Sequence, residues 1–123
     1  MTSAPKTAAS AAIADLANDL IGLSKDIWAN PESGFREQRT ARQVAEFMRK
    51  IGLEPRENIA MTGVIARLDT GRPGPHIAIM GELDSLIVPE HTEADPETGA
   101  VHVCGHNIQV ANMLAAAFGL SQP

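Results

Sequence analysis

The sequence contains no tyrosine, one tryptophan and three phenylalanines, so aromatic side chains contribute little to any core. A core must therefore rest on Ala, Leu, Ile, Val and Met, which are among the most frequently buried residue types. The hydrophobic share of 44% and the charged share of 20% are ordinary for a globular protein. A chain of 123 residues is long enough for one small domain or for part of a larger one.

Three further scarcities exclude classes of protein. A single cysteine cannot form an internal disulfide, which excludes a disulfide-stabilised scaffold. The net charge of −5 argues against a nucleic-acid partner, because phosphate binding depends on clustered Lys and Arg. No apolar run approaches the roughly 18 residues of a membrane span, and the first residues lack the apolar core of a signal peptide. We therefore expect no membrane partner and a cytoplasmic location.

Apolar residues at three- and four-residue steps predict amphipathic helices over residues 13–30, over residues 37–51 and from Asn107 onward. Asn30-Pro31 ends the first helix and Gly52 stops the second. Asn107 is a good N-cap for the third helix. Residues 1–12 are small and polar, and we expect them to form a flexible tail.

Between the second and third helices, the pattern changes to that of strands. Strands are predicted at residues 63–68 and 76–80, with a third near residues 54–59. The near-continuous apolar run from His76 to Met80 predicts burial on both faces. The fold class is therefore α/β, with helices packed on a mixed, largely buried β-sheet. Two or three strands leave an open edge, so we expect an incomplete sheet.

The stretch VHVCGHNIQV, residues 101–110, holds two histidines and the only cysteine. In an extended backbone, Cys104 and His106 project to the same side, and a thiolate and an imidazole suit Zn²⁺ or a similar divalent ion. The residues alone leave two alternatives open. Cys104 is a nucleophile with His106 or His102 as its base, or it is a small buried side chain.

Two carboxylates follow the strand predicted at residues 76–80. Glu82 and Asp84 come directly after it, at its C-terminal end. In open α/β sheets, ligands bind at the C-terminal ends of strands. The alternative is a strand that leaves the core into solvent, with acidic residues for solubility.

Five ordered blocks resemble the beginning of M20-type metallo-amidohydrolases, the branch with N-acyl-amino-acid, indole-acetyl-amino-acid and aminobenzoyl-glutamate hydrolases. The blocks are NPESGFREQRTARQVAEFMRKIGLEP, TGVIARL, GRPGP, GELDSL and HVCGHN. The resemblance implies that Cys104 and His106 are metal ligands and that Asp84 supports the site from outside the ligand set. It implies an α/β catalytic domain, of which residues 13–123 would form the N-terminal part, with a lid or dimerisation domain inserted later.

The resemblance also implies a chemistry and partners. The expected cofactor is a divalent metal, Zn²⁺ first and Mn²⁺, Co²⁺ or Ni²⁺ as alternatives, with two ions in the complete enzyme. The expected substrate is a small amide such as an N-acyl amino acid, and the complete protein is expected to be a homodimer. The general base, a glutamate of a later Glu-Glu pair, is not found in these 123 residues, so we expect the chain alone to be inactive.

Three residues depart from the family's pattern, which is an acidic D-x-D-A-L segment followed by H-A-C-G-H-D-x-H. Glu82 replaces the first aspartate, Asn107 replaces the aspartate after glycine-histidine, and Gln109 replaces the following histidine. These changes affect the expected metal identity and substrate. A hypothesis of a different class is a noncatalytic chain that acts by pairing its open sheet edge with a partner chain.

Overall fold

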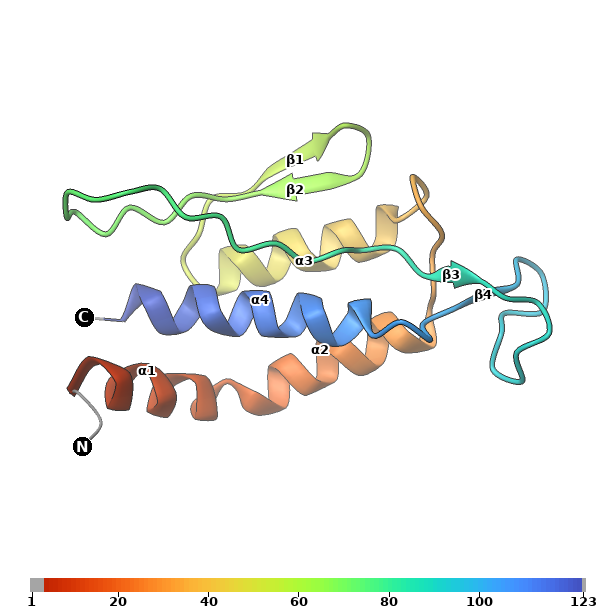
Figure 1. The fold of residues 1–123 in the computed structure, drawn as a ribbon, viewed down its shortest axis with the longest axis horizontal. Helices are drawn as coiled ribbons and strands as arrows, with labels where there is room; N and C mark the ends of the chain where they lie inside the picture. Colours follow the sequence, from red (N-terminus) through yellow and green to blue (C-terminus); the bar gives the residue numbers. More distant parts are fainter. Residues whose placement is uncertain (1–3, 123) are drawn as a thin grey trace.

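The chain folds into four helices and four short strands in the computed structural model, which describes residues 4–122. The helices are α1 (Ala4–Asp15), α2 (Ala17–Ala29), α3 (Gln38–Lys50) and α4 (His106–Ser121). The strands are β1 (Arg56–Ile59), β2 (Gly63–Ile65), β3 (Leu86–Ile87) and β4 (Ala100–Val101). Helix α4 runs between the α1–α2 pair and α3 (Figure 1). The predicted α/β class is confirmed.

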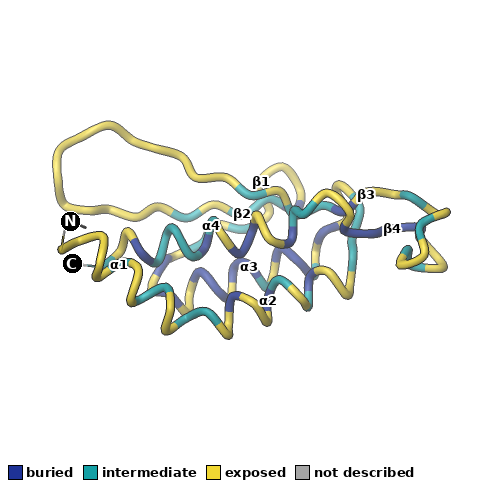
Figure 2. The backbone as a smooth tube through the Cα atoms, turned by 60° about the horizontal axis from the view of Figure 1, so that its bottom comes forward, coloured by how far each residue is buried: buried dark blue, intermediate teal, exposed yellow. Residues whose placement is uncertain are grey.

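The core lies where α2, α3 and α4 face one another (Figure 2). Its largest fully buried apolar side chains come from all three helices and are Ile27, Val44, Val110 and Leu114. The apolar residues of α3 face this core, since Ala41, Val44, Ala45, Phe47 and Met48 are all buried. On α4, Ile108 points away from the core and is 57% exposed.

The N-terminal region differs from the sequence-based prediction. Residues 4–12, expected to be a flexible tail, belong to helix α1, and residues 1–3 lie outside the described part. The predicted single helix over residues 13–30 bends at Leu16, which separates α1 from α2. An alanine-rich sequence favours helix, and α1 packs on α4 so closely that a Cβ on Gly119 would lie 2.9 Å from Ile13 Cδ1. None of the helices described is long and apolar enough to cross a membrane.

The strands form two separate sheets rather than one buried sheet. β1 pairs with β2 and β3 pairs with β4, each time antiparallel. β1 confirms the strand expected near residues 54–59. The strand predicted at residues 76–80 is wrong, because the segment is extended without a strand partner in the described part of the chain. Ile77 and Met80 are 83% and 81% exposed, so this segment's apolar pattern is not matched by burial.

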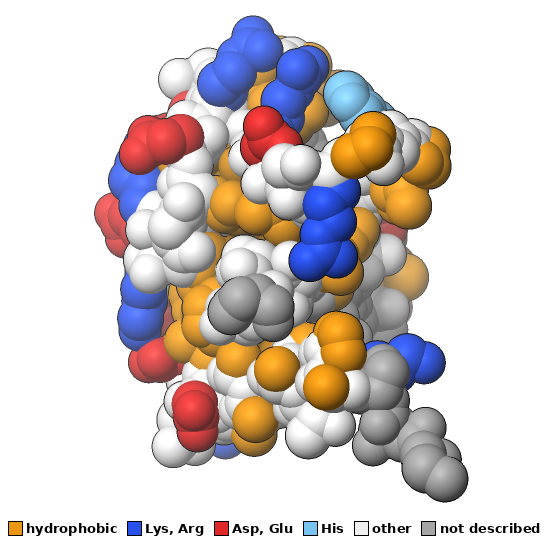
Figure 3. Space-filling model, turned by 90° about the vertical axis from the view of Figure 1, so that its left-hand side faces the viewer, with side chains coloured by type: hydrophobic (Ala, Val, Ile, Leu, Met, Phe, Trp, Pro, Cys, Tyr) orange, Lys and Arg blue, Asp and Glu red, His pale blue; other side chains and the backbone are white. Residues whose placement is uncertain are grey.

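Apolar side chains consequently reach the surface. In Figure 3, orange side chains lie open to solvent between charged ones, on the end of the molecule where both termini lie. Ile77, Ile79 and Met80 are among the exposed large apolar residues. Exposed apolar side chains on an extended backbone favour association with other chains.

Glu32 connects the loop after α2 to two other parts of the chain. Its carboxylate accepts hydrogen bonds from the Arg39 N–H (3.0 Å), the Thr40 N–H (2.7 Å) and the Thr40 hydroxyl (2.9 Å). Glu37, the residue that precedes α3, makes no side-chain cap, so Glu32 supplies the acceptors for the helix start. The Glu32 carbonyl accepts the Ser85 N–H at 2.8 Å, which ties residues 82–86 to this loop.

Glu32→Gln should lower the free energy of unfolding by about 1–2 kcal/mol, the usual cost of losing a helix N-cap. The amide keeps one acceptor oxygen but removes the charge that favours the start of a helix. Urea denaturation followed by circular dichroism measures the change. Glu46→Gln, at an exposed position of α3, is the control and should change stability little. Equal stability of the two variants would contradict the capping role of Glu32.

Replacing Ile77 and Met80 together with lysine should reduce self-association of the chain and leave its unfolding free energy nearly unchanged. Both side chains are exposed, so the substitutions remove apolar surface without opening the core. Size-exclusion chromatography with light scattering measures the association. The control is Ile21→Lys on α2, which adds charge at another exposed apolar position. A wild-type chain that is already a monodisperse monomer would disprove the expectation.

Candidate functional site

The segment with the two predicted carboxylates crosses directly over α4. Gly81 lies against the helix, since a Cβ there would be 3.3 Å from Val110 Cα and 3.4 Å from Met113 Sδ. The next residue, Glu82, donates its backbone N–H to Gln109 Oε1 at 2.6 Å. Close packing and this hydrogen bond place residues 81–84 beside the first turn of α4.

His106, the first residue of α4, is held from two sides by that segment. Its Nδ1 lies 2.8 Å from the Asp84 carbonyl oxygen and 3.2 Å from Asp84 Oδ1. Its Nε2 lies 3.1 Å from Glu82 Oε2. The imidazole is largely buried, with 14% of its side chain exposed. The structure therefore brings together Asp84 and His106, two of the three predicted site residues, and adds Glu82.

Cys104, the third predicted site residue, lies in the turn before α4. The thiol is free and the residue is exposed, so the alternative of a buried structural cysteine is wrong. Gly105 follows with φ of 90°, a left-handed conformation that glycine adopts without strain. Among residues 4–122, no three His, Cys, Asp or Glu side chains come together as a metal site. Joint ligation by Cys104 and His106 stays a prediction.

His102 is a buried neighbour of the site. Its exposed fraction is 6%, and its Nε2 has no hydrogen-bond partner within the described residues. Burial lowers the pKa of His102, the charge of His106 lowers it further, and Asp84 opposes both effects. His102 is therefore uncharged near neutral pH, which is the form in which an imidazole binds metal or accepts a proton. The sequence shows a histidine at position 102, but nothing in it indicates that the side chain is buried with an unpaired ring nitrogen.

Asn107 joins α4 to α2 and does not cap α4. Its amide donates to the Ser24 carbonyl oxygen at 3.2 Å and to Ser24 Oγ at 3.1 Å. The N-cap position belongs to Gly105, so the prediction that Asn107 is the N-cap is wrong. The Ser24 carbonyl oxygen can only accept a hydrogen bond, so the side chain at position 107 must donate one, which an amide nitrogen does and an ionised carboxylate cannot do.

Gln109 and Glu82, two of the three departures from the family pattern, contact each other. Beside the bond from the Glu82 N–H, Gln109 Nε2 donates to Glu82 Oε2 at 3.3 Å. Sequence reasoning missed this pair, although both residues stood out as departures. The pairing across 27 positions explains why the two replacements are compatible with each other.

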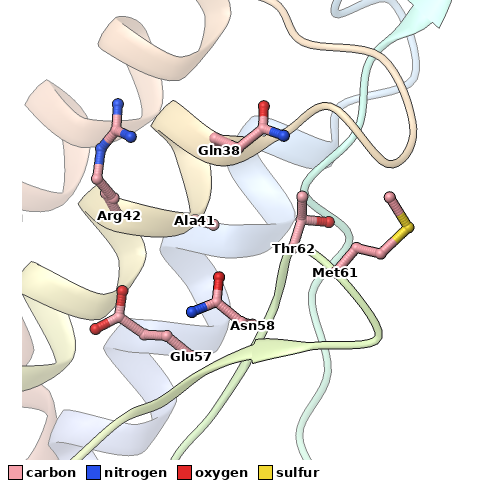
Figure 4. A pocket seen from close by; sticks show the side chains of 7 residues that line it. All are labelled: Gln38, Ala41, Arg42, Glu57, Asn58, Met61 and Thr62. Carbon is pink, nitrogen blue, oxygen red and sulfur yellow. The ribbon is translucent and has the colours of Figure 1, made fainter.

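A hollow of about 230 Å³ lies between α3 and the β1–β2 hairpin (Figure 4). It is lined by Gln38, Ala41, Arg42, Glu57, Asn58, Met61 and Thr62. Thr62 also donates its hydroxyl proton to the buried Glu37 carboxylate at 2.7 Å. None of the predicted site residues lines this hollow, so it is separate from the candidate site.

Similarity to known proteins covers most of the chain. The sequence is 32% identical over 103 residues, 80% of this chain, to thermostable carboxypeptidase 2 of Saccharolobus solfataricus. It is 33% identical over 101 residues, again 80% of the chain, to IAA-amino acid hydrolase ILR1-like 2 of Arabidopsis thaliana. It is 32% identical over 111 residues, 88% of the chain, to the N-acyl-L-amino acid amidohydrolase of Geobacillus stearothermophilus.

The matched part corresponds to 26%, 23% and 30% of these three relatives, so the chain spans about a quarter of their length. Protein-family profiles give no match, and solved structures give none either. The relatives are hydrolases of the kinds that the sequence blocks indicated, which confirms the resemblance.

Asn107→Asp, which restores the family's residue, should destabilise this chain by about 1–3 kcal/mol, the cost of leaving buried polar groups unpaired. The carboxylate would face the Ser24 carbonyl oxygen, so two acceptors would replace a donor–acceptor pair. Thermal and urea unfolding measure the loss. Asn112→Asp on the exposed side of α4 is the matched control and should be close to neutral. Equal effects at both positions would contradict the role assigned to the contact with Ser24.

Proposed function

Because this chain is a relative of the N-terminal part of M20-type amidohydrolases and peptidases, we propose that it contributes to the metal site of an amide-hydrolysing enzyme. The substrate class is a small amide such as an N-acyl amino acid. The observation that carries the proposal is the His106 imidazole, whose Nδ1 is bound by Asp84 while its Nε2 faces away from that residue toward a carboxylate.

The donor set suits a borderline divalent metal such as Zn²⁺. The Asp84 carbonyl oxygen only accepts hydrogen bonds, so Nδ1 of a neutral His106 carries the proton and Nε2 keeps its lone pair. A histidine held by a carbonyl or carboxylate through one nitrogen and free at the other is the usual form of a metal-binding imidazole. The exposed Cys104 would add a thiolate two residues away, a ligand that Zn²⁺ accepts readily.

Each residue of the chain then has a defined task. His106 and Cys104 would hold the metal, which when bound activates water and polarises the amide carbonyl. Asp84 orients the imidazole through its contacts with Nδ1. The remaining ligands and the general base would come from outside these 123 residues, since no three ligand side chains converge within residues 4–122.

Cys104→Ser and Asp84→Asn test the two roles separately. Cys104→Ser should lower both the affinity for Zn²⁺ and the bound metal, because a hydroxyl is a much poorer ligand than a thiolate. Asp84→Asn should weaken Zn²⁺ binding by about 10- to 100-fold, the usual effect of losing a residue that orients a ligand. Competition with a chromophoric chelator measures affinity, and elemental analysis measures content.

Circular dichroism and urea unfolding of both variants distinguish a local change from loss of the fold. Unchanged Zn²⁺ binding in Cys104→Ser would remove the thiol from the site. The chain itself should not hydrolyse N-acyl amino acids with Zn²⁺ or Mn²⁺ added. Metal-dependent turnover by it would disprove the placement of the general base elsewhere.

A further inference from the structure

A second hollow, of about 320 Å³, lies between the C-terminal end of α2 and the loop that joins β3 to β4. Its volume is at the lower end of the range of small-ligand pockets, about 300–1,000 Å³. Apolar side chains and two carboxylates line it, among them Trp28, Pro31, Pro96 and Val101 and the acids Glu93 and Asp95. Cys104, His106 and Asp84 are not among the lining residues, so this hollow is separate from the candidate metal site.

The apolar part of the lining includes the only tryptophan of the chain. Trp28 is 43% exposed, whereas tryptophan is highly buried on average. Val101 is 2% exposed and forms the buried side of the hollow. An accessible indole attracts organic cations through its π-system, more strongly than the other aromatic side chains do. The lining therefore combines apolar contact surface with a group that favours positive charge.

The charged part of the lining is negative. The Glu93 carboxylate makes no hydrogen bond or ion pair within residues 4–122. The Thr98 hydroxyl and N–H, each 2.7 Å from Asp95 Oδ1, hold the pKa of Asp95 below its ordinary value, so this carboxylate is ionised near neutral pH. These bonds do not use Oδ2, which a ligand can approach. Because the described lining includes no Lys, Arg or His, both negative charges stay uncompensated.

The loop that carries the two carboxylates is held in place by its own hydrogen bonds. The Asp95 N–H donates to the Ala100 carbonyl oxygen at 2.9 Å, and the Gly99 N–H donates to the Asp95 carbonyl oxygen at 2.8 Å. Gly99 packs so closely on Pro89 that a Cβ there would lie 2.9 Å from Pro89 Cγ. A wall that is already ordered loses little conformational entropy when a ligand binds.

We propose that this hollow binds a small organic cation, an ammonium group carried on an apolar body. Trp28, Pro31 and Pro96 contact the body, and the Glu93 and Asp95 carboxylates attract the charge. An anion would be repelled by the carboxylates, and a neutral molecule would gain nothing from them. The proposal does not depend on the metal site, because the two sites share no residue.

Benzyltrimethylammonium is the probe, because it carries a permanent positive charge beside a small apolar ring. Trp28 is the only tryptophan and the chain has no tyrosine, so the indole emission reports on this hollow alone. Adding the probe at constant ionic strength should change this emission saturably, with a dissociation constant in the millimolar range. Benzyl alcohol and benzoate, the neutral and anionic counterparts, should bind at least about 5-fold more weakly.

Three variants test the lining. Glu93→Gln should weaken binding of the probe about 2- to 5-fold, the usual contribution of one exposed charge pair. Glu90→Gln makes the same change of charge at an exposed position outside the lining, and this matched control should bind as the wild type does. Trp28→Leu should weaken binding about 3- to 10-fold, measured by ligand-observed NMR because this variant has no tryptophan. Asp95 is left unchanged because its hydrogen bonds hold the loop.

The absence of a saturable change in the wild type would overturn the proposal. Benzyl alcohol binding as tightly as the cation would also overturn it, since the hollow would then be apolar without a preference for charge. Equal affinities of Glu93→Gln and Glu90→Gln would contradict the attraction by the carboxylates. Circular dichroism shows whether each variant is folded. If Trp28→Leu is unfolded, Trp28→Phe replaces it, and wild-type affinity in that variant would overturn the role of the indole.

Discussion

The Glu32 carboxylate is the interaction on which the arrangement of the site depends. It supplies acceptors to the first turn of α3, including the fully buried Thr40, whose N–H and hydroxyl would otherwise lack partners. The same residue accepts the Ser85 N–H through its backbone carbonyl. One residue therefore fixes where α3 begins and where the segment with Glu82 and Asp84 ends. Without it, the carboxylates would be attached to α4 through Gln109 and His106 alone.

The two halves of the site differ in how firmly they are supported. His106 stands on α4, whose Val110 and Leu114 are fully buried in the core. The amide of Asn107 ties the same helix turn to α2. The carboxylates stand on a segment without regular structure, which is held by hydrogen bonds at Ser85, Glu82 and Asp84. A rigid imidazole and adjustable carboxylates suit a site in which the acidic residues adapt to the bound group.

The helices could be predicted from the sequence because their signal is local. The periodicity of residues 37–51 gave α3 within a residue at each end, and the Gly52 stop has φ of 86°. The apolar run at residues 76–80 was misleading, because a strand needs a neighbouring strand and none is supplied within the described residues. Helix propensity in the alanine-rich N-terminus was underestimated, so α1 was missed.

Part of the site could also be predicted, because that part has a local signal in the sequence. The spacing of Cys104 and His106 is visible in the sequence, and Asp84 followed from the resemblance. The partners that orient them come from far along the chain: Gln109 is 27 positions from Glu82, and Asn107 is 83 positions from Ser24. No local pattern encodes such contacts. The departures at Glu82, Asn107 and Gln109 marked the residues involved, while their partners required the structure.

The long separation between Asn107 and Ser24 has a kinetic consequence. Closing a loop of that length costs chain entropy before its contacts contribute, and proteins rich in distant contacts fold slowly. The helices can form early from local contacts, whereas His106 reaches its carboxylates only after α4 has docked on α2. During biosynthesis, this site would be absent from the nascent chain until α4 had left the ribosome and docked on α2.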